Sequence, residues 1–369
     1  YVNYVDVKIP LPAGFQWKKE FNYSVKLIYS ILGATETKKA DVFSFPHTSY
    51  EFISKELLLK QGNINSFNFL RINEKTKTIT IQAGKNCVDK DMIIPSGYRL
   101  LADGTVTLDF TKHSKLISYS PLFFEGTEQT PVAVVSSDFS FEGIKIINAE
   151  KSILKNIVFK NLPSFQDAEW SGGAAIAFYE SPVYLNSCNF YNCHSQAVIN
   201  LVRSDFEISN CLFQKNVSGI TTQYSHGKIN NCSIENSMQH AVKIMKGNIT
   251  INDIFISGPT KYGLTAEGGT ELTGNRITIK NSQVGILSKE QSQIEINYLT
   301  VSNTAIGIVT YNSNNEGDTE ITVNGYVSKE VKTDYLKQKN CVLKINGILA
   351  TEETTNIEEI LKRNEKMSD

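Results

Sequence analysis

Residues 206–244 read FEISNCLFQKNVSGITTQYSHGKINNCSIENSMQHAVKI, and they belong to a longer repetitive stretch that runs from Gly173 to Asn324. Through this stretch a small residue recurs every 22 positions, as Ala175, Ala197, Gly219, Ala241, Gly263, Gly285 and Gly307. An apolar residue keeps step with it every 21 to 23 positions, as Phe190, Phe213, Ile234, Ile256, Ile279 and Val301. A fixed period in the low twenties predicts a solenoid, in which each repeat forms one turn.

Each repeat contains short runs of alternating apolar and polar residues, such as FEISNCLF and GKINNCSI, separated by Asn, Ser and Gly. Alternation turns one face of a strand inward, and Asn or Gly supplies the left-handed bends that join strands. The Leu framework of leucine-rich repeats and the 3.6-residue period of helical repeats are both missing. We therefore predict an all-β fold, a right-handed parallel β-helix with about 22 residues per coil and coils stacked at roughly 4.8 Å.

Two further columns flank the apolar one. Two residues after it a polar corner recurs, as Asn192, Asn236, Asn281 and Asn303, with Lys215 and Gly258 as exceptions. Two residues before it lie Cys188, Cys211 and Cys232. Stacked residues keep parallel Cα–Cβ vectors, whereas a disulfide needs converging ones, so we predict free thiols packed in the core. The other cysteines, Cys87, Cys193 and Cys341, show no CxxC spacing and no paired histidine, so we expect no metal site.

Composition sets limits on the class of protein. The chain has 369 residues, 41% of them hydrophobic, with 37 basic and 38 acidic side chains. It is long enough for one large solenoid and a smaller element, and a net charge near zero removes the usual reason to expect nucleic acid or an anionic membrane as a partner. The sequence contains no apolar run of about 18 residues, so no membrane-spanning helix is predicted. Tyr1 follows no leader, so we expect either a removed signal peptide or a fragment, and an extracellular or cell-surface location.

The chain divides into three predicted parts: residues 1–70, a β-rich capping element; residues 71–350, the β-helix; and residues 351–369, a helical tail. In the first part, YSVKLIYSIL predicts a strand and TSYEFISKELLLKQG a short helix capped by Thr48 or Ser49. A cap is expected because the end of a solenoid exposes an unpaired layer of strands. In the tail, Ile357, Ile360 and Leu361 have helical spacing.

The segments IIPSGYRLLADGTVTLDF, ISYSPLFFEGTEQTPVAVVSSD, WSGGAAIAFYESPVYLNSCNFYNC and VRSDFEISNCLF carry a family resemblance. Over roughly residues 75–350 the chain resembles bacterial right-handed β-helix repeat proteins, sometimes joined to CotH-type, kinase-like domains. The resemblance implies the fold but little about function, because β-helices host lyases, hydrolases, epimerases, adhesins and inert spacers. Relatives often have Asp in the coils that here contain Gln196, Ala197, Gly219 and His240, which lowers the expectation of hydrolysis or calcium binding.

One repeat, from Phe159 to Phe190, is longer than its neighbours, and the excess is LPSFQDAEWSGG. Insertions in solenoids emerge as loops on one face, and such loops often bind ligands. Trp170, with Asp167 and Glu169, is therefore a candidate ligand-binding group. The alternative is a loop that packs one aromatic side chain back on the coil.

A basic and aromatic strip is the other candidate site. Its members, on successive coils, are His226, His240, Lys243, Lys246, Lys261 and Tyr262. Such a strip suits an acidic polysaccharide, with Tyr262 and Lys246 as binding residues, or a lyase, with Lys243, His240 and His226 as catalytic candidates. The alternative is a row of solvated side chains with a structural histidine. The two residue columns after the small-apolar pair place no carboxylates on neighbouring coils, so acid–base hydrolysis is not predicted.

The leading hypothesis is a non-catalytic extracellular or cell-surface β-helix that acts as a structural or binding component in a larger assembly. It rests on the missing carboxylate rows and the near-neutral charge. The alternatives are a polysaccharide lyase or related glycan-acting enzyme that uses the basic strip, and a carbohydrate-binding module centred on Trp170. We expect protein partners in a surface assembly, and polysaccharide is a candidate ligand. We expect no cofactor.

Overall fold

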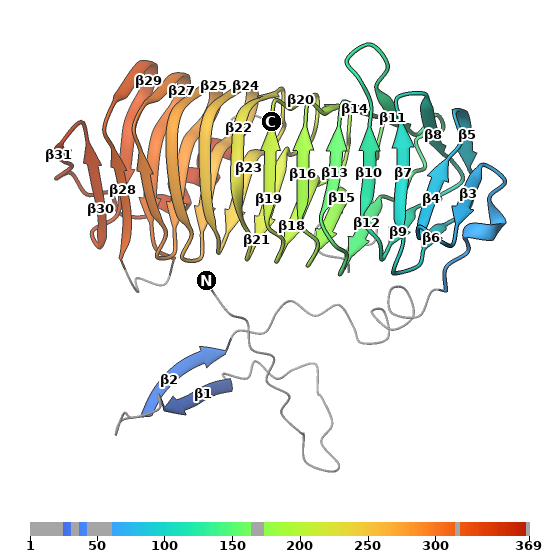
Figure 1. The fold of residues 1–369 in the computed structure, drawn as a ribbon. Helices are drawn as coiled ribbons and strands as arrows, with labels where there is room; N and C mark the ends of the chain where they lie inside the picture. Colours follow the sequence, from blue (N-terminus) through green and yellow to red (C-terminus); the bar gives the residue numbers. More distant parts are fainter. Residues whose placement is uncertain (1–24, 31–36, 43–60, 164–172, 314–317, 367–369) are drawn as a thin grey trace.

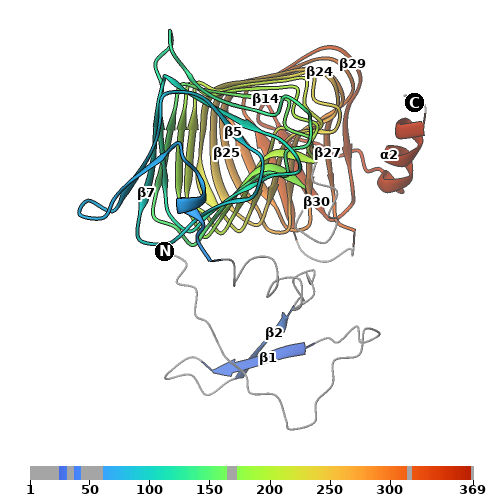
Figure 2. The ribbon, with the colours of Figure 1, turned by 90° about the vertical axis from the view of Figure 1, so that its right-hand side faces the viewer.

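The computed structural model describes residues 25–30, 37–42, 61–163, 173–313 and 318–366. From β4 (Thr78–Ile81) to β30 (Cys341–Ile345) the chain winds into a parallel β-solenoid of about 12 turns with ~22 residues per turn. Figure 1 shows the turns side by side along one axis, and Figure 2 looks along the stack. The predicted β-helical architecture and its period are confirmed.

Each full turn contributes to three parallel sheets. The first sheet contains β4, β7 (Arg99–Asp103), β10 (Leu122–Glu125), β13 (Ser152–Lys155), β16 (Val183–Asn186), β19 (Phe206–Ser209), β26 (Gln293–Ile296), β28 (Thr319–Val323) and β30. The second contains β5 (Gly84–Val88), β8 (Val106–Phe110), β11 (Val132–Val135), β14 (Ile157–Lys160), β17 (Asn189–Tyr191) and β20 (Leu212–Gln214). The third contains β6 (Met92–Ile94), β9 (Leu116–Ser118), β12 (Ile144–Ile147), β15 (Ala174–Tyr179), β18 (Ala197–Val202), β21 (Ile220–Gln223) and β23 (His240–Met245).

Toward the C-terminal end, longer strands bend around the corners and serve several sheets. They are β22 (His226–Glu235), β24 (Asn248–Glu267), β25 (Glu271–Lys289), β27 (Leu299–Tyr311) and β29 (Tyr326–Lys337). Both β24 and β25 contribute to all three sheets, because their pairings run through almost their whole length.

The apolar column forms the core of the second sheet. The register pairs Phe190 with Phe213, Phe213 with Ile234, and so on to Val301, as the period predicts. The rings of Phe159, Phe190 and Phe213 stack with centroids 4.8 and 4.6 Å apart, and all three side chains are buried. Like residues therefore lie one above another at the spacing of adjacent strands.

The column of small residues holds with one correction. Gly219, Ala241, Gly263, Gly285 and Gly307 are consecutive in the register, but the residue opposite Gly219 is Val198, because Ile199 pairs with Ile220. Ala197 instead pairs with Ala174. The corner between Phe190 and Val198 holds more residues than the corner between Phe213 and Gly219. Because of this difference, the residue paired with Gly219 is one position later than the 22-residue period predicts. A Cβ atom on Gly285 would lie 2.6 Å from the carbonyl oxygen of Gly307, so close packing of successive coils explains the small residue there.

The polar corner column adopts the left-handed backbone that its composition predicts. Values of φ are 57° at Asn192, 57° at Lys215, 56° at Asn236 and 109° at Gly258, and Asn281 and Asn303 lie in the same region. The amide of Asn303 donates to the side-chain oxygen of Asn281 at 2.7 Å. Asparagine therefore serves the corner twice, through its tolerance of positive φ and through its side-chain ladder.

The cysteine column also agrees with the prediction. Cys188, Cys211 and Cys232 are free and buried, and the column continues as Ile254 below Cys232. Burial raises the pKa of the Cys193 thiol to about 12, and the pKa values of Cys211 and Cys232 are raised beyond the physiological range by neighbouring thiols and burial. These thiols pack as small apolar residues of the core.

Residues 61–73 close the N-terminal end of the solenoid. Asn63 mimics a strand beside β6: its backbone N–H donates to the Ile93 carbonyl at 3.1 Å, and its side-chain oxygen accepts from the Ile93 N–H at 2.8 Å. The short 3-10 helix η1 (Ile64–Ser66) and β3 (Leu70–Asn73) follow, and β3 pairs antiparallel with β4. Ile64, Phe67 and Phe69 from this segment are buried on the end of the core.

At the other end β31 (Ile348–Leu349) pairs antiparallel with β30, and the chain then reaches the helix α2 (Ile357–Lys366). Ile357 and Leu361 of α2 are buried against the outer face of the third sheet, which confirms the predicted short C-terminal helix. The hairpin of β1 (Val25–Ser30) and β2 (Thr37–Val42) forms a separate two-stranded sheet. The helix predicted after Thr48 lies outside the described residues. In the described part of the chain, no helix has the length and apolar character needed to cross a bilayer.

Candidate functional site

The outer face of the third sheet carries three residues of the predicted basic strip, His240, Lys243 and Tyr262. Strands β23, β24 and β25 are adjacent there, and the register places Lys243 opposite Thr265 and His240 opposite Tyr262. Alternation turns Lys243 and Thr265 away from the core, because their neighbours Val242, Ile244, Leu264 and Ala266 point inward. His240 lies before the two consecutive buried residues Ala241 and Val242, where alternation is interrupted, and it reaches the same surface through its contacts with Tyr262 and Thr265. The strands thus fix three of the predicted site residues, His240, Lys243 and Tyr262, on one surface.

His240 is held between two neighbours on β24. Its ring stacks on Tyr262 with centroids 5.0 Å apart and an interplanar angle of 18°, and its Nδ1 lies 3.1 Å from the hydroxyl of Thr265. Burial, assisted by the positive charge of Lys243, lowers the pKa of His240 to about 4. The imidazole is therefore neutral at pH 7 and is already engaged in a hydrogen bond.

Lys243 is committed to an ion pair. Its Nζ lies 2.6 Å from Oε1 of Glu267, and the other carboxylate oxygen, Oε2, lies 2.8 Å from Nζ of Lys289. The side chain of Glu267 is 11% exposed. Burial alone would raise the pKa of Glu267, but the two lysines lower it below its usual value, so the carboxylate is ionised. Two cations and one nearly buried anion form a bridge across three coils.

The chemistry of this cluster is limited by these contacts. A proton abstractor must be deprotonated and within reach of its substrate. Nζ of Lys243 is engaged by the carboxylate of Glu267, and His240 has one ring nitrogen next to Thr265 and one ring face against Tyr262. The arrangement is that of a satisfied polar network on a sheet surface.

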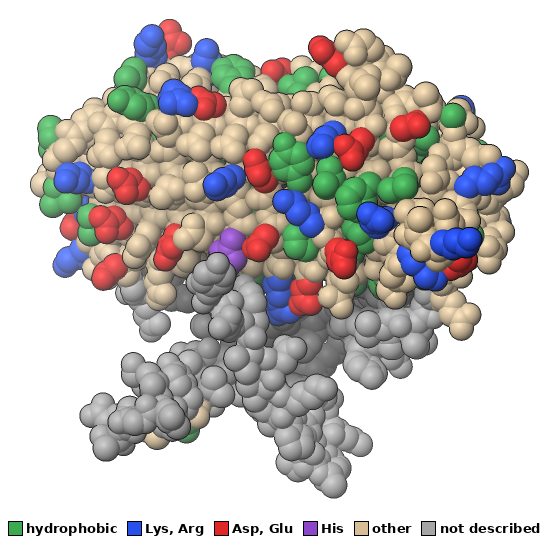
Figure 3. Space-filling view, viewed as in Figure 1, with side chains coloured by type: hydrophobic (Ala, Val, Ile, Leu, Met, Phe, Trp, Pro, Cys, Tyr) green, Lys and Arg blue, Asp and Glu red, His purple; other side chains and the backbone are tan. Residues whose placement is uncertain are grey.

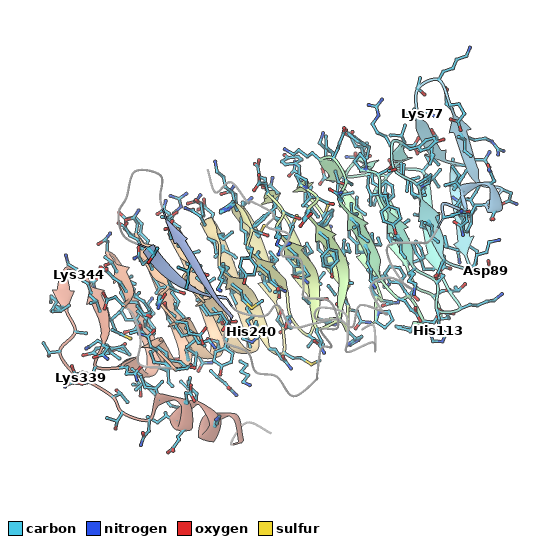
Figure 4. The ribbon with its side chains drawn as sticks, turned by 90° about the horizontal axis from the view of Figure 1, so that it is seen from below. Lys77, Asp89, His113, His240, Lys339 and Lys344 are labelled. Carbon is cyan, nitrogen blue, oxygen red and sulfur yellow. The ribbon has the colours of Figure 1, made fainter. Side chains whose placement is uncertain are left out.

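Of the other members of the basic strip, His226 and Lys246 lie elsewhere and Lys261 stays close to Tyr262. His226 begins β22 in the first sheet, where it pairs with Asn248, so it is on a different face from His240. Lys246 follows β23 at a corner with positive φ, and its ammonium lies 5.4 Å from the ring centroid of Tyr224. Lys261 remains close, with Nζ 5.5 Å from the ring centroid of Tyr262. Figure 4 shows His240 well separated from His113, which lies toward the N-terminal end of the solenoid.

The insertion candidates Trp170, Asp167 and Glu169 lie outside the described residues. The register on either side of the insertion is nevertheless kept, because Phe159 pairs with Phe190 across it.

Glu267 and Lys289 were missed by the sequence analysis. The two residue columns that were searched for carboxylates are those of Lys243 and Ile244. The next outward position along each strand gives Met245, Glu267 and Lys289, which are one residue beyond those rows. Simple alternation, continued to this position, would have found Glu267, the partner of Lys243, and Lys289, the second partner of Glu267.

The first sheet holds a second polar feature that the sequence analysis did not consider. A depression of about 410 Å³ on its outer face is lined by Glu271, Leu272, Thr273, Gln293, Ile294, Glu295, Glu320 and Thr322. One of its carboxylates, Glu271, accepts a hydrogen bond from the amide of Asn248 at 2.8 Å. Among the described residues, no three His, Cys, Asp or Glu side chains are grouped so that they could hold a metal ion.

Next to the charged cluster, the third sheet is apolar on its outer face. The patch and the helix that covers it consist of Tyr262, Val284, Leu287, Ile306, Val309, Tyr311, Ile357 and Leu361. Tyr262 therefore contacts His240 on one side and belongs to the α2 patch on the other. The helix covers the face where a ligand would otherwise reach the coils beyond Lys289.

Solved structures with a similar chain trace have low sequence identity. The periplasmic alginate epimerase AlgG gives a TM-score of 0.44 at 10% identity, with 75% of this chain and 80% of that chain covered. The surface protein and adhesin PfbA of Streptococcus pneumoniae gives 0.38 at 12% identity, covering 73% and 88%. Endopolygalacturonase I of Stereum purpureum gives 0.36 at 10% identity, covering 80% and 99%. No curated protein matches the sequence.

A family model described as "Right handed beta helix region" matches residues 123–248 and residues 197–358 in two overlapping segments. Together these segments span more than half of the chain, and they include the third-sheet cluster and most of the first sheet. The matched residues lie in coils that stack in register in the structure. The chain belongs to the right-handed β-helix family.

Proposed function

We propose that this protein is a non-catalytic extracellular or cell-surface β-helix that serves as a structural or binding component of a larger assembly. The observation that carries the proposal is the bridge from Lys243 through Glu267 to Lys289, with contacts of 2.6 and 2.8 Å. The lysine best suited to abstract a proton is paired with a carboxylate, and the neighbouring histidine is hydrogen-bonded and stacked. The side chains that a lyase would use thus stabilise the sheet instead.

The proposal also agrees with the shape of the polar surface. The corners carry asparagine ladders and exposed ion pairs such as Arg276 with Asp253, in which Nη2 and Oδ2 lie 2.7 Å apart. These contacts link one coil to the next along the outside of the solenoid. A long stack supported on the inside by apolar columns and on the outside by such ladders suits a rigid spacer or binding platform.

The test is an assay of purified protein on a panel of uronic-acid polysaccharides, with ultraviolet absorbance of unsaturated products and reducing-end formation as readouts. We expect no products from the wild type. Lys243→Ala and His240→Gln variants, with the exposed His113→Gln variant as a control, should show the same baseline. Product formation by the wild type that is lost in Lys243→Ala would overturn the proposal in favour of a lyase.

A binding arm of the same experiment addresses the carbohydrate-binding alternative. A glycan array with the wild type and a Trp170→Ala variant reports whether the insertion recognises sugars. Glycan binding that depends on Trp170, without any product formation, would identify the protein as a carbohydrate-binding component. If no glycan binds, an assembly component should be recognised by the proteins that co-purify with it.

A further inference from the structure

An apolar row crosses the outer face of the first sheet, where the rest of the face is polar. The register aligns Leu101 with Phe123, Phe123 with Ile153, and Ile153 with Tyr184, on β7, β10, β13 and β16. All four side chains alternate with buried core residues, so they point outward, and each is partly exposed. Figure 3 shows hydrophobic side chains gathered over β10, β13 and β16.

Opposite charges flank this row. The guanidinium of Arg99 lies 6.0 Å from the ring centroid of Phe123, and the ammonium of Lys151 lies 5.8 Å from that of Tyr184. On the other side of the row, Nζ of Lys155 lies 3.0 Å from Oε2 of Glu125.

The mixture of charges decides which kind of partner fits the row. An apolar centre with a polar, mixed-charge rim is typical of a protein interface. An acidic polysaccharide is less suitable, because Asp103, Glu125 and Glu207 lie in or beside the row and would repel it. A protein with its own apolar strip and alternating charges matches both the centre and the rim.

We propose that a second copy of this chain packs on this face, with the two solenoid axes antiparallel and a twofold axis between β10 and β13. This operation reverses the row, so that Phe123 faces the partner's Ile153 and Leu101 faces the partner's Tyr184. It also brings Glu125 opposite the partner's Lys155, and Lys155 opposite the partner's Glu125. The face is therefore complementary to itself in its apolar row and in its charges, as a twofold interface requires.

The size of the face sets the strength of the association. The face is built from strands of four or five residues that stack at ~4.8 Å over five or six coils. Its area is therefore smaller than the roughly 800 Å² that each partner buries in a standard interface. We therefore expect a reversible dimer with a dissociation constant on the order of micromolar. Most of the affinity comes from the apolar row, because exposed ion pairs contribute little.

Sedimentation velocity over a range of concentrations from below one micromolar to about a hundred micromolar tests the proposal. The wild type should shift from monomer to dimer across this range. A Phe123→Lys/Ile153→Lys variant should remain monomeric, since both positions point outward and the fold is kept, which circular dichroism and thermal unfolding verify. Thr273→Lys is the matched control, because it lies in the same row several coils away, and it should dimerise like the wild type.

A charge exchange tests the orientation of the two copies. Lys155→Glu alone places two carboxylates opposite each other in the dimer, and Glu125→Lys alone places two lysines opposite each other, so each variant should dimerise several-fold more weakly. Mixing the two variants restores both opposite-charge contacts, so heterodimers should form. A wild type that stays monomeric, a dimer that survives Phe123→Lys/Ile153→Lys, or a mixture no tighter than either variant would overturn the proposal.

Discussion

Replacing Phe190 with alanine is expected to lower the free energy of unfolding by about 3–5 kcal/mol. The ring is fully buried in the centre of a stack, with Phe159 4.8 Å away on one side and Phe213 4.6 Å away on the other. Its removal takes away the apolar burial of a phenyl ring and leaves a cavity between two coils. The coils cannot close this cavity, because their spacing is fixed by backbone hydrogen bonds between adjacent strands.

Urea unfolding followed by circular dichroism measures this loss. Tyr191→Ala is the matched control, because Tyr191 is the next residue on β17 and points outward. It should change the free energy of unfolding by less than about 1 kcal/mol. Equal losses in the two variants would mean that the register of the second sheet is displaced by one residue, since such a slip exchanges the inward and outward positions.

Lowering the pH from about 7.5 to about 5 is expected to remove roughly 2 kcal/mol of stability through His240 alone. Burial and the charge of Lys243 lower its folded pKa from 6.5 to about 4, with smaller effects of Glu267, Lys261 and Lys289. The unfolded chain therefore takes up a proton that the folded protein does not. The stabilisation is fully present above the unfolded pKa and declines as the pH falls toward the folded pKa.

The difference between wild type and His240→Gln isolates this contribution. The variant should lose less stability than the wild type between the two pH values, whereas His113→Gln should follow the wild type, because the His113 side chain is 78% exposed. Parallel curves for wild type and His240→Gln would show that the imidazole titrates as it does in water, and that the contacts with Tyr262 and Thr265 do not hold it neutral.

The period and the columns of the solenoid could be predicted from the sequence because every coil has the same structural requirements. Apolar residues such as Phe213 must face the core, and corners such as Asn236 need a backbone with positive φ. Both demands recur at a fixed spacing, so they leave a visible pattern. The buried cysteines follow from the same register, since their column continues as Ile254.

Details that depend on corner length were less accessible. The alignment of Ala197 with Gly219 was wrong by one position, because a period of 22 averages over corners of different length, and only backbone pairing shows that Val198 is the neighbour of Gly219. The ion-pair partner of Lys243, and the second lysine that binds this partner, were missed for a related reason. Glu267 and Lys289 belong to the next coils, and their contacts depend on which residue of each strand is the last to face outward.

Contacts between distant elements left no signal in the repeat. Helix α2 is more than 45 residues beyond β27 in sequence, yet Ile357 covers the apolar patch of Val284 and Val309 on the third sheet. Helical spacing predicted the helix but not the face on which it packs. The apolar row from Leu101 to Tyr184 was likewise invisible, because it becomes continuous only when coils of unequal length are aligned.

The central claim is that the charged cluster on the third sheet stabilises the solenoid and does no chemistry. A double-mutant cycle on Lys243 and Glu267 tests it most directly, with Lys243→Ala, Glu267→Ala and the double variant unfolded in urea at pH 7. The account predicts a favourable coupling free energy of about 1–2 kcal/mol, because the carboxylate is nearly buried and lies 2.6 Å from the ammonium. A coupling free energy near zero would contradict it, because Lys243 would then be available for a substrate.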